Sequence, residues 1–363
     1  MKNQYPERFY ILDVFRGFAA LAVVLFHYRV FYATDVSLNK IEVNQQPLYN
    51  IFFLAYNHGW IAVQFFFTLS GFIFYNFYLN KISNNQINFK NFFILRFSRL
   101  YPLHLLTLIL ITLIIFANIG NYDFQNIDNF HFLLNIFLIQ SWGFENGPSY
   151  NEPSWSISIE ILMYSIFFLI ALRKKFIFFS TIFLIVISSV IFFKYKLLGY
   201  GGFCFFVGGM TYLIYNKIKS KLITENKKSN VNYVLFFILQ IFLTIFIIKK
   251  FNFSTIEIKI ILLLYFFPLI ILTSIFLQQY KILIIDKISK IGDISYSIYM
   301  IHFVIQAYVI SILSYLNIVV NFNSLLIFCS YLLFLIILSY CSNRYFEKPA
   351  QKIIRSYYGS YIN

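Results

Sequence analysis

The sequence predicts an all-α polytopic membrane protein with about ten transmembrane helices and both termini in the cytoplasm. Of its 363 residues, 60% are hydrophobic and only 12% are charged. Apolar runs of about eighteen residues or more recur along the chain, and a soluble core cannot bury so much apolar surface. Lysines and arginines gather in alternate loops, which is the pattern that orients membrane helices.

About ten apolar stretches are long enough to cross the hydrocarbon core of a bilayer as helices. In chain order they cover residues 10–33, 52–79, 101–119, 155–172, 176–193, 198–216, 233–249, 258–279, 294–316 and 322–342. Another apolar run, 130–142, is too short to span and is typical of an interfacial or re-entrant segment. We expect a membrane domain over residues 1–349 and a short cytoplasmic tail over 350–363.

Charge sets the orientation of these spans. With the N-terminus in the cytoplasm, most of the 29 lysines and arginines fall on the inner side, and the acidic residues Asp123 and Asp128 fall outside. The net charge of +15 is therefore mainly a topology signal, and anionic membrane lipid accounts for it without nucleic acid. The three cysteines lie within spans and lack the spacing of a metal site, so we expect packing roles and no metal.

Arg16 and His27 share one face of the first predicted helix. Eleven helical steps of about 100° return to within roughly 20° of the starting direction, about 16 Å further along the axis. Ionisable groups inside a bilayer cost free energy and mark candidate functional sites. A plainer interpretation stays open, in which Arg16 forms a local ion pair with Asp13 and His27 is a hydrogen-bonded core histidine.

Two further clusters lie in and after the second span. Ser70 and Gly71 form a small pair in an aromatic stretch, which more often permits close helix packing than binds a ligand. Arg96 and Arg99 lie three residues apart on a short amphipathic segment, 89–100, before the third span. Two guanidinium groups on one helical turn suit phosphate recognition, although arginines that contact lipid headgroups give the same pattern.

A carboxylate and a second histidine complete the polar set. Glu160 lies roughly 7–8 Å below the outer interface that Trp155 marks, and His27 lies roughly 9 Å below the same surface. A histidine and a carboxylate therefore share one depth, and an intramembrane glutamate needs a partner. His302 lies a few turns inside the ninth span.

Six motifs carry a resemblance to a known family. They are LDVFRGFAALAVVLFH, FFFTLSGF, RFSRLYP, PSWSISIE, SYSIYMIH and YFEKP, in this order from Leu12 to Pro349. Together they closely resemble the acyltransferase-3 family of bacterial membrane-bound sugar O-acyltransferases. The family's paired arginine and histidine correspond to Arg16 and His27, its paired arginines to Arg96 and Arg99, and its helix-four carboxylate to Glu160.

The resemblance implies an O-acetyltransferase-like enzyme in the bacterial cytoplasmic (inner) membrane. Its donor would be acyl-coenzyme A, most simply acetyl-coenzyme A, and its acceptor a glycan or lipid-linked saccharide. We expect His27, Glu160 and Arg16 to be catalytic, with His27 as the base that Glu160 orients. The donor site would contain, besides the two arginines of the third motif, Ser70 and His302. A route through an acyl-histidine stays open as an alternative.

A transporter or flippase for lipid-linked glycans is the alternative from another functional class, since ten helices with buried charges also describe that architecture. The sequence lacks the paired half-repeats and the two matched Gly/Pro-broken helices that favour a transporter. An inactive family member retained as a binding partner is a third possibility, and the intact Arg16, His27 and Glu160 argue against it.

Overall fold

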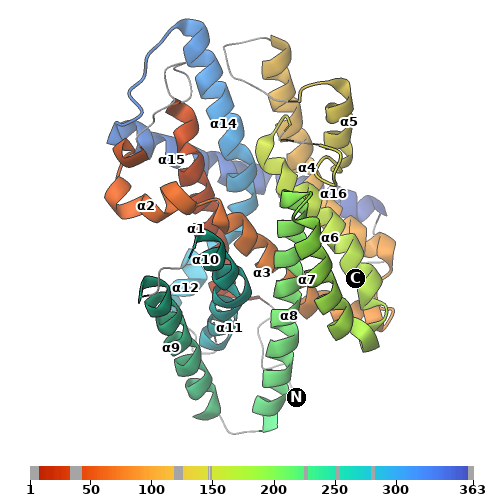
Figure 1. The fold of residues 1–363 in the computed structure, drawn as a ribbon. Coiled ribbons are helices and arrows are strands. Elements are labelled where there is room, and N and C mark those ends of the chain that lie inside the picture. The colour runs from red at the N-terminus through yellow and green to blue at the C-terminus, as the bar shows by residue number, and fades with distance from the viewer. Residues whose placement is uncertain are drawn as a thin grey trace. The chain divides into compact units, whose positions relative to one another are not determined.

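A computed structural model describes residues 8–32, 43–117, 126–145, 147, 149–224, 228–250, 254–278 and 283–358 of the chain (Figure 1). Within these ranges every element of regular structure is a helix. The α-helices are α1 (Tyr10–His27), α2 (Tyr49–His58), α3 (Ile61–Ser83), α4 (Phe89–Ala117), α5 (Asn129–Phe137), α6 (Trp155–Ala171), α7 (Ile177–Ile191), α8 (Lys196–Thr224), α9 (Lys228–Lys250), α10 (Thr255–Ile261), α11 (Phe267–Leu277), α12 (Leu283–Ile288), α13 (Lys290–Asp293), α14 (Ser295–Leu316), α15 (Leu325–Cys341) and α16 (Lys348–Tyr358).

The transmembrane prediction is confirmed. In the described part of the chain, nine helical stretches are long and apolar enough to cross a bilayer, and an apolar stretch of α9, Val234–Ile247, is shorter. These ten segments coincide with the ten predicted spans. The protein is thus an all-α, multi-pass membrane protein, whereas the side of the membrane on which its termini lie stays a prediction. Residues 33, 118, 119, 279 and 359–363 of the predicted spans and tail lie outside the described residues.

Contacts divide the chain into two compact units. The first contains Met1–Gly17, Gln64–Gln86 and Ile166–Gly292, and the second contains Phe18–Val63, Ile87–Ser165 and Asp293–Asn363. Each unit is described by itself.

In the first unit, α3 and α8 cross in backbone contact. A Cβ added to Gly71 would lie 1.8 Å from the carbonyl oxygen of Phe205, and one added to Gly208 would lie 1.8 Å from that of Thr68. Only glycine permits helices to approach so closely. The packing role predicted for the Ser70–Gly71 pair is therefore confirmed for Gly71.

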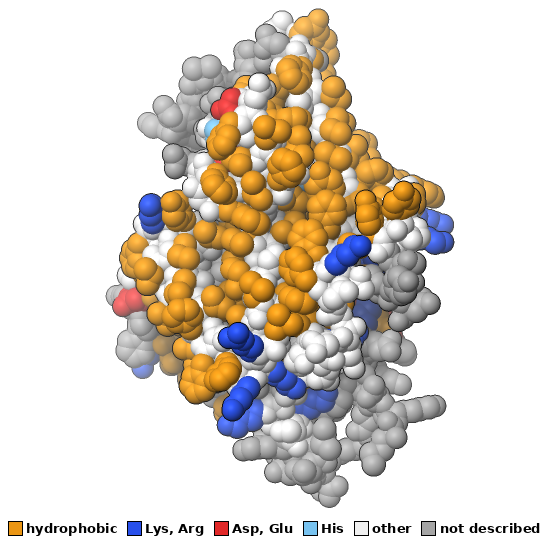
Figure 2. Space-filling model, turned by 90° about the vertical axis from the view of Figure 1, so that its right-hand side faces the viewer, with side chains coloured by type: hydrophobic (Ala, Val, Ile, Leu, Met, Phe, Trp, Pro, Cys, Tyr) orange, Lys and Arg blue, Asp and Glu red, His pale blue; other side chains and the backbone are white. Residues whose placement is uncertain are grey.

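The outer surface of α7 shows how the first unit meets lipid. Phe179, Phe183, Val186 and Val190 follow one another at helical spacing and are 70%, 62%, 56% and 65% exposed. In water such a stripe would be a liability, but in a bilayer it is the lipid-facing side. Figure 2 shows a broad hydrophobic surface on one face of the molecule, with few charged side chains within it.

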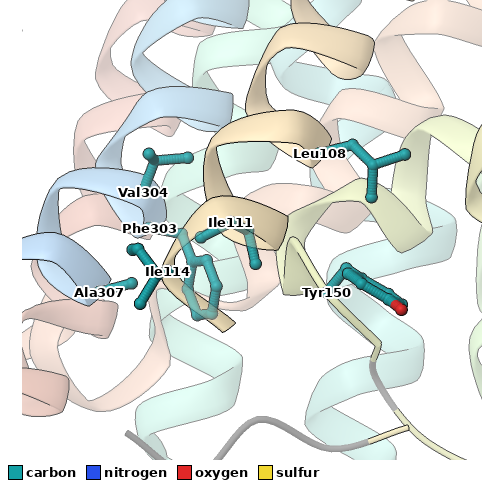
Figure 3. Packing of buried hydrophobic residues seen from close by; sticks show 7 residues of the cluster. All are labelled: Leu108, Ile111, Ile114, Tyr150, Phe303, Val304 and Ala307. Atoms are coloured by element: carbon teal, nitrogen blue, oxygen red, sulfur yellow. The ribbon is translucent and has the colours of Figure 1, made fainter. Parts of the chain in front are cut away.

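In the second unit, α14 is the most deeply buried long helix of the described residues. It packs against α4 through a hydrophobic cluster whose members are Leu108, Ile111, Ile114, Tyr150, Phe303, Val304 and Ala307 (Figure 3). Because this cluster fixes one side of α14, the polar residues on the other sides of the helix are held at defined positions.

Two predicted boundaries were wrong. The second span, 52–79, is broken at Gly59 and Trp60 into α2 and α3. Conversely, the amphipathic segment 89–100 and the third span form one continuous helix, α4, with Pro102 inside it. Proline removes one backbone hydrogen bond, and neighbouring helices supply donors near the break. The hydroxyl of Tyr296 donates to the Leu100 carbonyl at 2.5 Å.

Most of the described tail is ordered as a helix. After α15 the chain forms a π-helical segment, Ser342–Glu347, and continues as α16. The guanidinium of Arg355 fastens α16 to α4, because its Nε donates to Ser98 Oγ at 3.2 Å and its Nη2 donates to the Leu95 carbonyl at 3.3 Å. The short apolar run predicted at 130–142 contains the nine-residue helix α5.

Candidate active site

Two histidines meet in the second unit. His27 is the last residue of α1, and His302 lies within α14. The Nε2 atom of His302 is 3.2 Å from the Nδ1 atom of His27, and the ring centroids are 5.1 Å apart. His302 is 0% exposed, whereas His27 as a whole residue is partly exposed. The pair therefore combines a partly exposed residue with a fully buried one.

The end of α1 is fixed by its neighbours. The side-chain Nε2 of Gln306 donates to the His27 carbonyl at 3.0 Å, at the point where α1 passes into the 3-10 helix Tyr28–Tyr32. The hydroxyl of Tyr28 donates to the Phe322 carbonyl at 3.0 Å. A Cβ added to Gly59 would lie 2.1 Å from the Ala22 carbonyl oxygen, so the end of α2 packs directly on α1. The backbone that carries His27 is thus held from several sides.

The two ring nitrogens of His27 differ in their surroundings. Nδ1 faces His302 and also lies 3.1 Å from the Val23 carbonyl oxygen, one turn earlier. Nε2 makes no hydrogen bond to any residue that the structure describes. A ring nitrogen that no described residue engages, on a partly exposed residue, is the arrangement that a general base needs.

The sequence had led us to expect that Glu160 contacts His27 and orients its ring. The structure places the two residues without such a contact. On α6 the Glu160 carboxylate accepts a hydrogen bond from the Tyr164 hydroxyl, one turn later. It also lies near Tyr299 of α14. The ring centroid of Tyr299 is 6.0 Å from that of His302, and its hydroxyl donates to the Pro153 carbonyl at 3.0 Å. Glu160 therefore belongs to the same polar interior as the histidines without bonding to His27.

Arg96 and Arg99 lie on successive turns of the amphipathic half of α4. Arg99 is exposed and Arg96 is half-buried. Arg99 interacts electrostatically with Glu347, whose carboxylate accepts from the Ser297 hydroxyl at 2.6 Å. The Arg355 side chain of α16 reaches the same turns of α4, at Leu95 just before Arg96 and at Ser98 just before Arg99. Three guanidinium groups thus converge on one stretch of α4.

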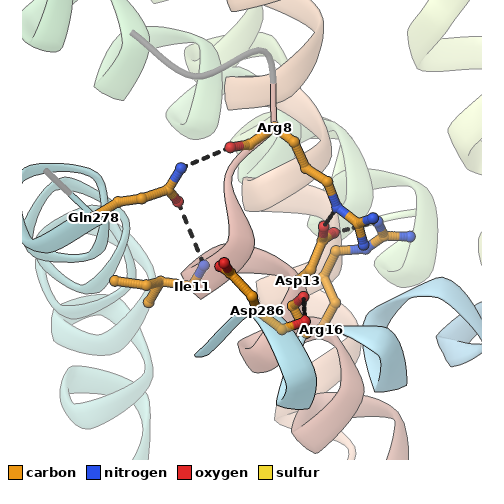
Figure 4. A network of polar contacts seen from close by, with 7 residues as sticks. Arg8, Ile11, Asp13, Arg16, Gln278 and Asp286 are labelled. Atoms are coloured by element: carbon orange, nitrogen blue, oxygen red, sulfur yellow. Dashed lines mark hydrogen bonds and ion pairs between the residues drawn. The ribbon is translucent and has the colours of Figure 1, made fainter. Parts of the chain in front are cut away.

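Arg16 and Ser70 belong to the first unit. Nη1 of Arg16 is 3.2 Å from Asp13 Oδ1, and Nε of Arg8 is 2.6 Å from Asp13 Oδ2. Gln278 bonds to the backbone of Arg8 and Ile11 in the same network (Figure 4). The local ion pair that the plainer interpretation predicted for Arg16 is therefore present. Ser70 is 9% exposed beside the close crossing of α3 and α8.

Comparison with known proteins identifies the family. The model of the acyltransferase-3 family, described as an acyltransferase domain, matches residues 9–344. The chain belongs to the acyltransferase-3 family. This match includes every site residue described above except Arg8, Glu347 and Arg355.

Two curated proteins are similar to parts of this acyltransferase-3 protein. Protein 2 in picA locus of Rhizobium radiobacter is 34% identical over 110 residues, which are 30% of this chain and 47% of that protein. Acyltransferase MdmB of Streptomyces mycarofaciens is 32% identical over 155 residues, which are 42% of this chain and 36% of that protein. The chain therefore spans less than half the length of each of these relatives. No solved structure matches it.

Three residues of this acyltransferase-3 protein escaped the sequence analysis. Tyr299 lies three residues before His302 and Gln306 four residues after it, so helical periodicity places both beside His302. That periodicity was the signal that could have identified them. Arg355 was missed because residues 350–363 were predicted to be a tail. The spacing of Lys348, Lys352 and Arg355 is helical and could have indicated α16.

Proposed function

We propose that this protein is a membrane O-acyltransferase that moves an acyl group, most simply acetyl, from cytoplasmic acyl-coenzyme A to a hydroxyl of a cell-surface or lipid-linked glycan. One observation carries the proposal. His27 is partly exposed inside a polytopic membrane protein and presents a ring nitrogen that none of the described residues engages. A polar group in that setting is costly unless it has a function.

His27 would act as the general base. Its Nε2 takes the proton of the acceptor hydroxyl while the hydroxyl oxygen bonds to the thioester carbonyl carbon. The carbon–sulfur bond then breaks, and the coenzyme A thiolate leaves and recovers the proton from Nε2. The histidine ends the cycle neutral, and no oxidant or metal takes part.

The donor would be held at its phosphates by Arg96 and Arg99. Planar guanidinium groups bind phosphate through paired hydrogen bonds, and Arg99 is exposed at the amphipathic end of α4. Arg16 and Ser70, both of the first unit, would be further contacts of the donor. Glu160 would act from its position near Tyr299, which lies beside His302.

The proposed acceptor can be tested directly in cells. Surface glycans and lipid-linked saccharides would be compared by mass spectrometry between cells that carry the wild-type gene, the His27→Gln gene or no gene. We expect loss of one acetyl group from the same glycan in the last two, with the His27→Gln protein present in the membrane. An unchanged glycan profile in cells without the gene would refute the proposed acceptor class, and an unchanged profile only with His27→Gln would refute the base.

A further inference from the structure

We infer that His302 is the residue that positions His27 for catalysis, as a neutral hydrogen-bond acceptor in the place where many acyltransferring enzymes use a carboxylate. The inference rests on the proposed function in that His27 is taken as the base. It gives His302 a role toward His27, where the sequence had suggested contact with the donor.

The hydrogen bonds of the pair determine where the protons lie. Nδ1 of His302 is 3.2 Å from the Ile298 carbonyl oxygen, and Nδ1 of His27 is 3.1 Å from the Val23 carbonyl oxygen. A carbonyl oxygen only accepts hydrogen bonds, so each Nδ1 must carry the hydrogen. A neutral imidazole has one N–H, and therefore Nε2 of His302 is an acceptor.

The contact between the rings then has a defined direction. Nδ1–H of His27 donates to Nε2 of His302 at 3.2 Å and shares its hydrogen with Val23, as bifurcated bonds at helix ends commonly do. The remaining nitrogen of His27, Nε2, must hold a lone pair. This is the nitrogen that lacks a partner among the described residues, so the tautomer leaves the lone pair on the atom that these residues do not engage.

Burial restricts His302 to this role. It is 0% exposed, and both of its ring nitrogens are engaged, Nδ1 with Ile298 and Nε2 with His27. It therefore has no polar atom to offer a substrate. His302 is a positioning residue.

The arrangement stabilises the charge that the reaction creates. When Nε2 of His27 takes the hydroxyl proton, the ring becomes an imidazolium, and its Nδ1–H bond to His302 becomes charge-assisted and stronger. His302 keeps its own proton on Nδ1 throughout. A neutral acceptor suits this site, because it leaves no permanent buried charge in the resting protein.

The test begins with the wild-type protein and needs no turnover. The full chain, labelled with ¹⁵N-histidine and reconstituted in liposomes, would be studied by solid-state NMR. Its five histidines are few enough that the His27→Gln spectrum identifies the His27 signals by difference. We expect His27 to carry its hydrogen on Nδ1, although free histidine favours Nε2. A hydrogen on Nε2 would overturn the inference even in a fully active acyltransferase.

Kinetics of two variants supply the second arm. His302→Leu removes the acceptor, and we expect kcat to fall about 10- to 100-fold with the KM for acetyl-coenzyme A unchanged. His302→Gln retains an acceptor oxygen and should recover most of that loss. His104→Leu is the matched control, since His104 is also 0% exposed and bonds at 2.8 Å to a carbonyl, that of Asn135. It should keep kcat within a few-fold.

The outcomes separate this inference from the proposed function. Normal kcat in His302→Leu, or equal impairment in a folded His302→Gln protein, would contradict the positioning role. Normal acylation by His27→Gln would instead contradict the base, and it would leave the NMR result unaffected.

Discussion

The two ends of α1 carry polar clusters of opposite kinds. Near its start, Asp13 lies between Arg8 and Arg16, with N–O distances of 2.6 Å and 3.2 Å, so that opposite charges face each other. At its end, His27 meets a second imidazole and keeps one nitrogen that no described residue engages. The first arrangement pairs its charged groups locally, whereas the second leaves an atom available. The comparison teaches that a polar residue in a membrane helix becomes a candidate for chemistry by what it leaves unbonded.

The largest effect should come from the available end. His27→Gln keeps a hydrogen-bonding group of similar size but removes the base, and acyl transfer should fall on the order of 10²–10⁴-fold. The rate would be measured with acetyl-coenzyme A and membranes that contain equal amounts of protein. Near-normal acyl transfer would show that the available nitrogen at the end of α1 has no catalytic role, so that the two ends of the helix would not differ in function.

Arg96 and Arg99 test whether exposed charged residues of α4 also have a function. Replacing Arg96 and Arg99 together with alanine should raise the KM for acetyl-coenzyme A about 10- to 100-fold, because charge-assisted bonds to phosphate are lost. Lysine replacements should recover only part, since the charge remains and the paired geometry does not. Lys90→Ala, an exposed charge on the same helix, is the control. An unchanged KM in the double alanine variant would assign the arginines to lipid headgroups.

The ion pair at the start of α1 offers a matched test of Arg16, because either partner can be replaced. Arg16→Gln should lower kcat/KM about 10- to 100-fold if its guanidinium contacts the donor. Asp13→Asn breaks the ion pair but leaves the guanidinium in place, so it should change kcat/KM less than about fivefold. Steady-state kinetics of both variants would be compared. Equal losses would mean that the ion pair itself is what matters, as in a purely structural cluster.

The smallest effect concerns a pair outside the membrane spans. The backbone N–H of His131 donates to Asp128 at 2.9 Å and its ring lies 2.7 Å from the same carboxylate, and these bonds hold the pKa of Asp128 below its usual value. Asp128 is the N-cap of α5. A carboxylate with a lowered folded pKa stabilises above its unfolded pKa, and this contribution is lost as the pH falls through the folded value.

Hydrogen exchange of α5, corrected for intrinsic rates, should therefore increase as the pH falls from neutral to about 3, and Asp128→Ala should abolish that dependence. Equal pH dependence in both proteins would show that the cap does not hold the helix.

Sequence patterns predicted most of the fold because bilayer thickness fixes the length of an apolar helix. Sequence patterns failed where a glycine or a proline within an apolar stretch could either end the helix or be accommodated in it. Gly59 ended a helix at the place where α2 packs on α1, whereas α4 continued through Pro102, with the Tyr296 hydroxyl bonded to the carbonyl of Leu100 in the same turn. Neither neighbour is visible in the sequence around the glycine or the proline.

The sequence could predict which residues belong to the candidate site, but it could not predict which of them contact one another. Periodicity placed Arg16 and His27 on one helix face, and it placed Arg96 and Arg99 on successive turns of α4. The choice of Glu160 as the partner of His27 rested on equal depth, and depth says nothing of which helices touch. The partner is His302, which is 275 residues away in the chain. Such a pairing depends on tertiary packing.

α14 determines the position of His27 through two separate bonds. His302 contacts its ring, and Gln306, one turn later, donates to its carbonyl. A slide of α1 by one residue relative to α14 would break both bonds together, so the axial register of the two helices is tied to the tautomer of the base. Lipid pressure or a bound acceptor that shifted this register would therefore move the base and release its tautomer in one step.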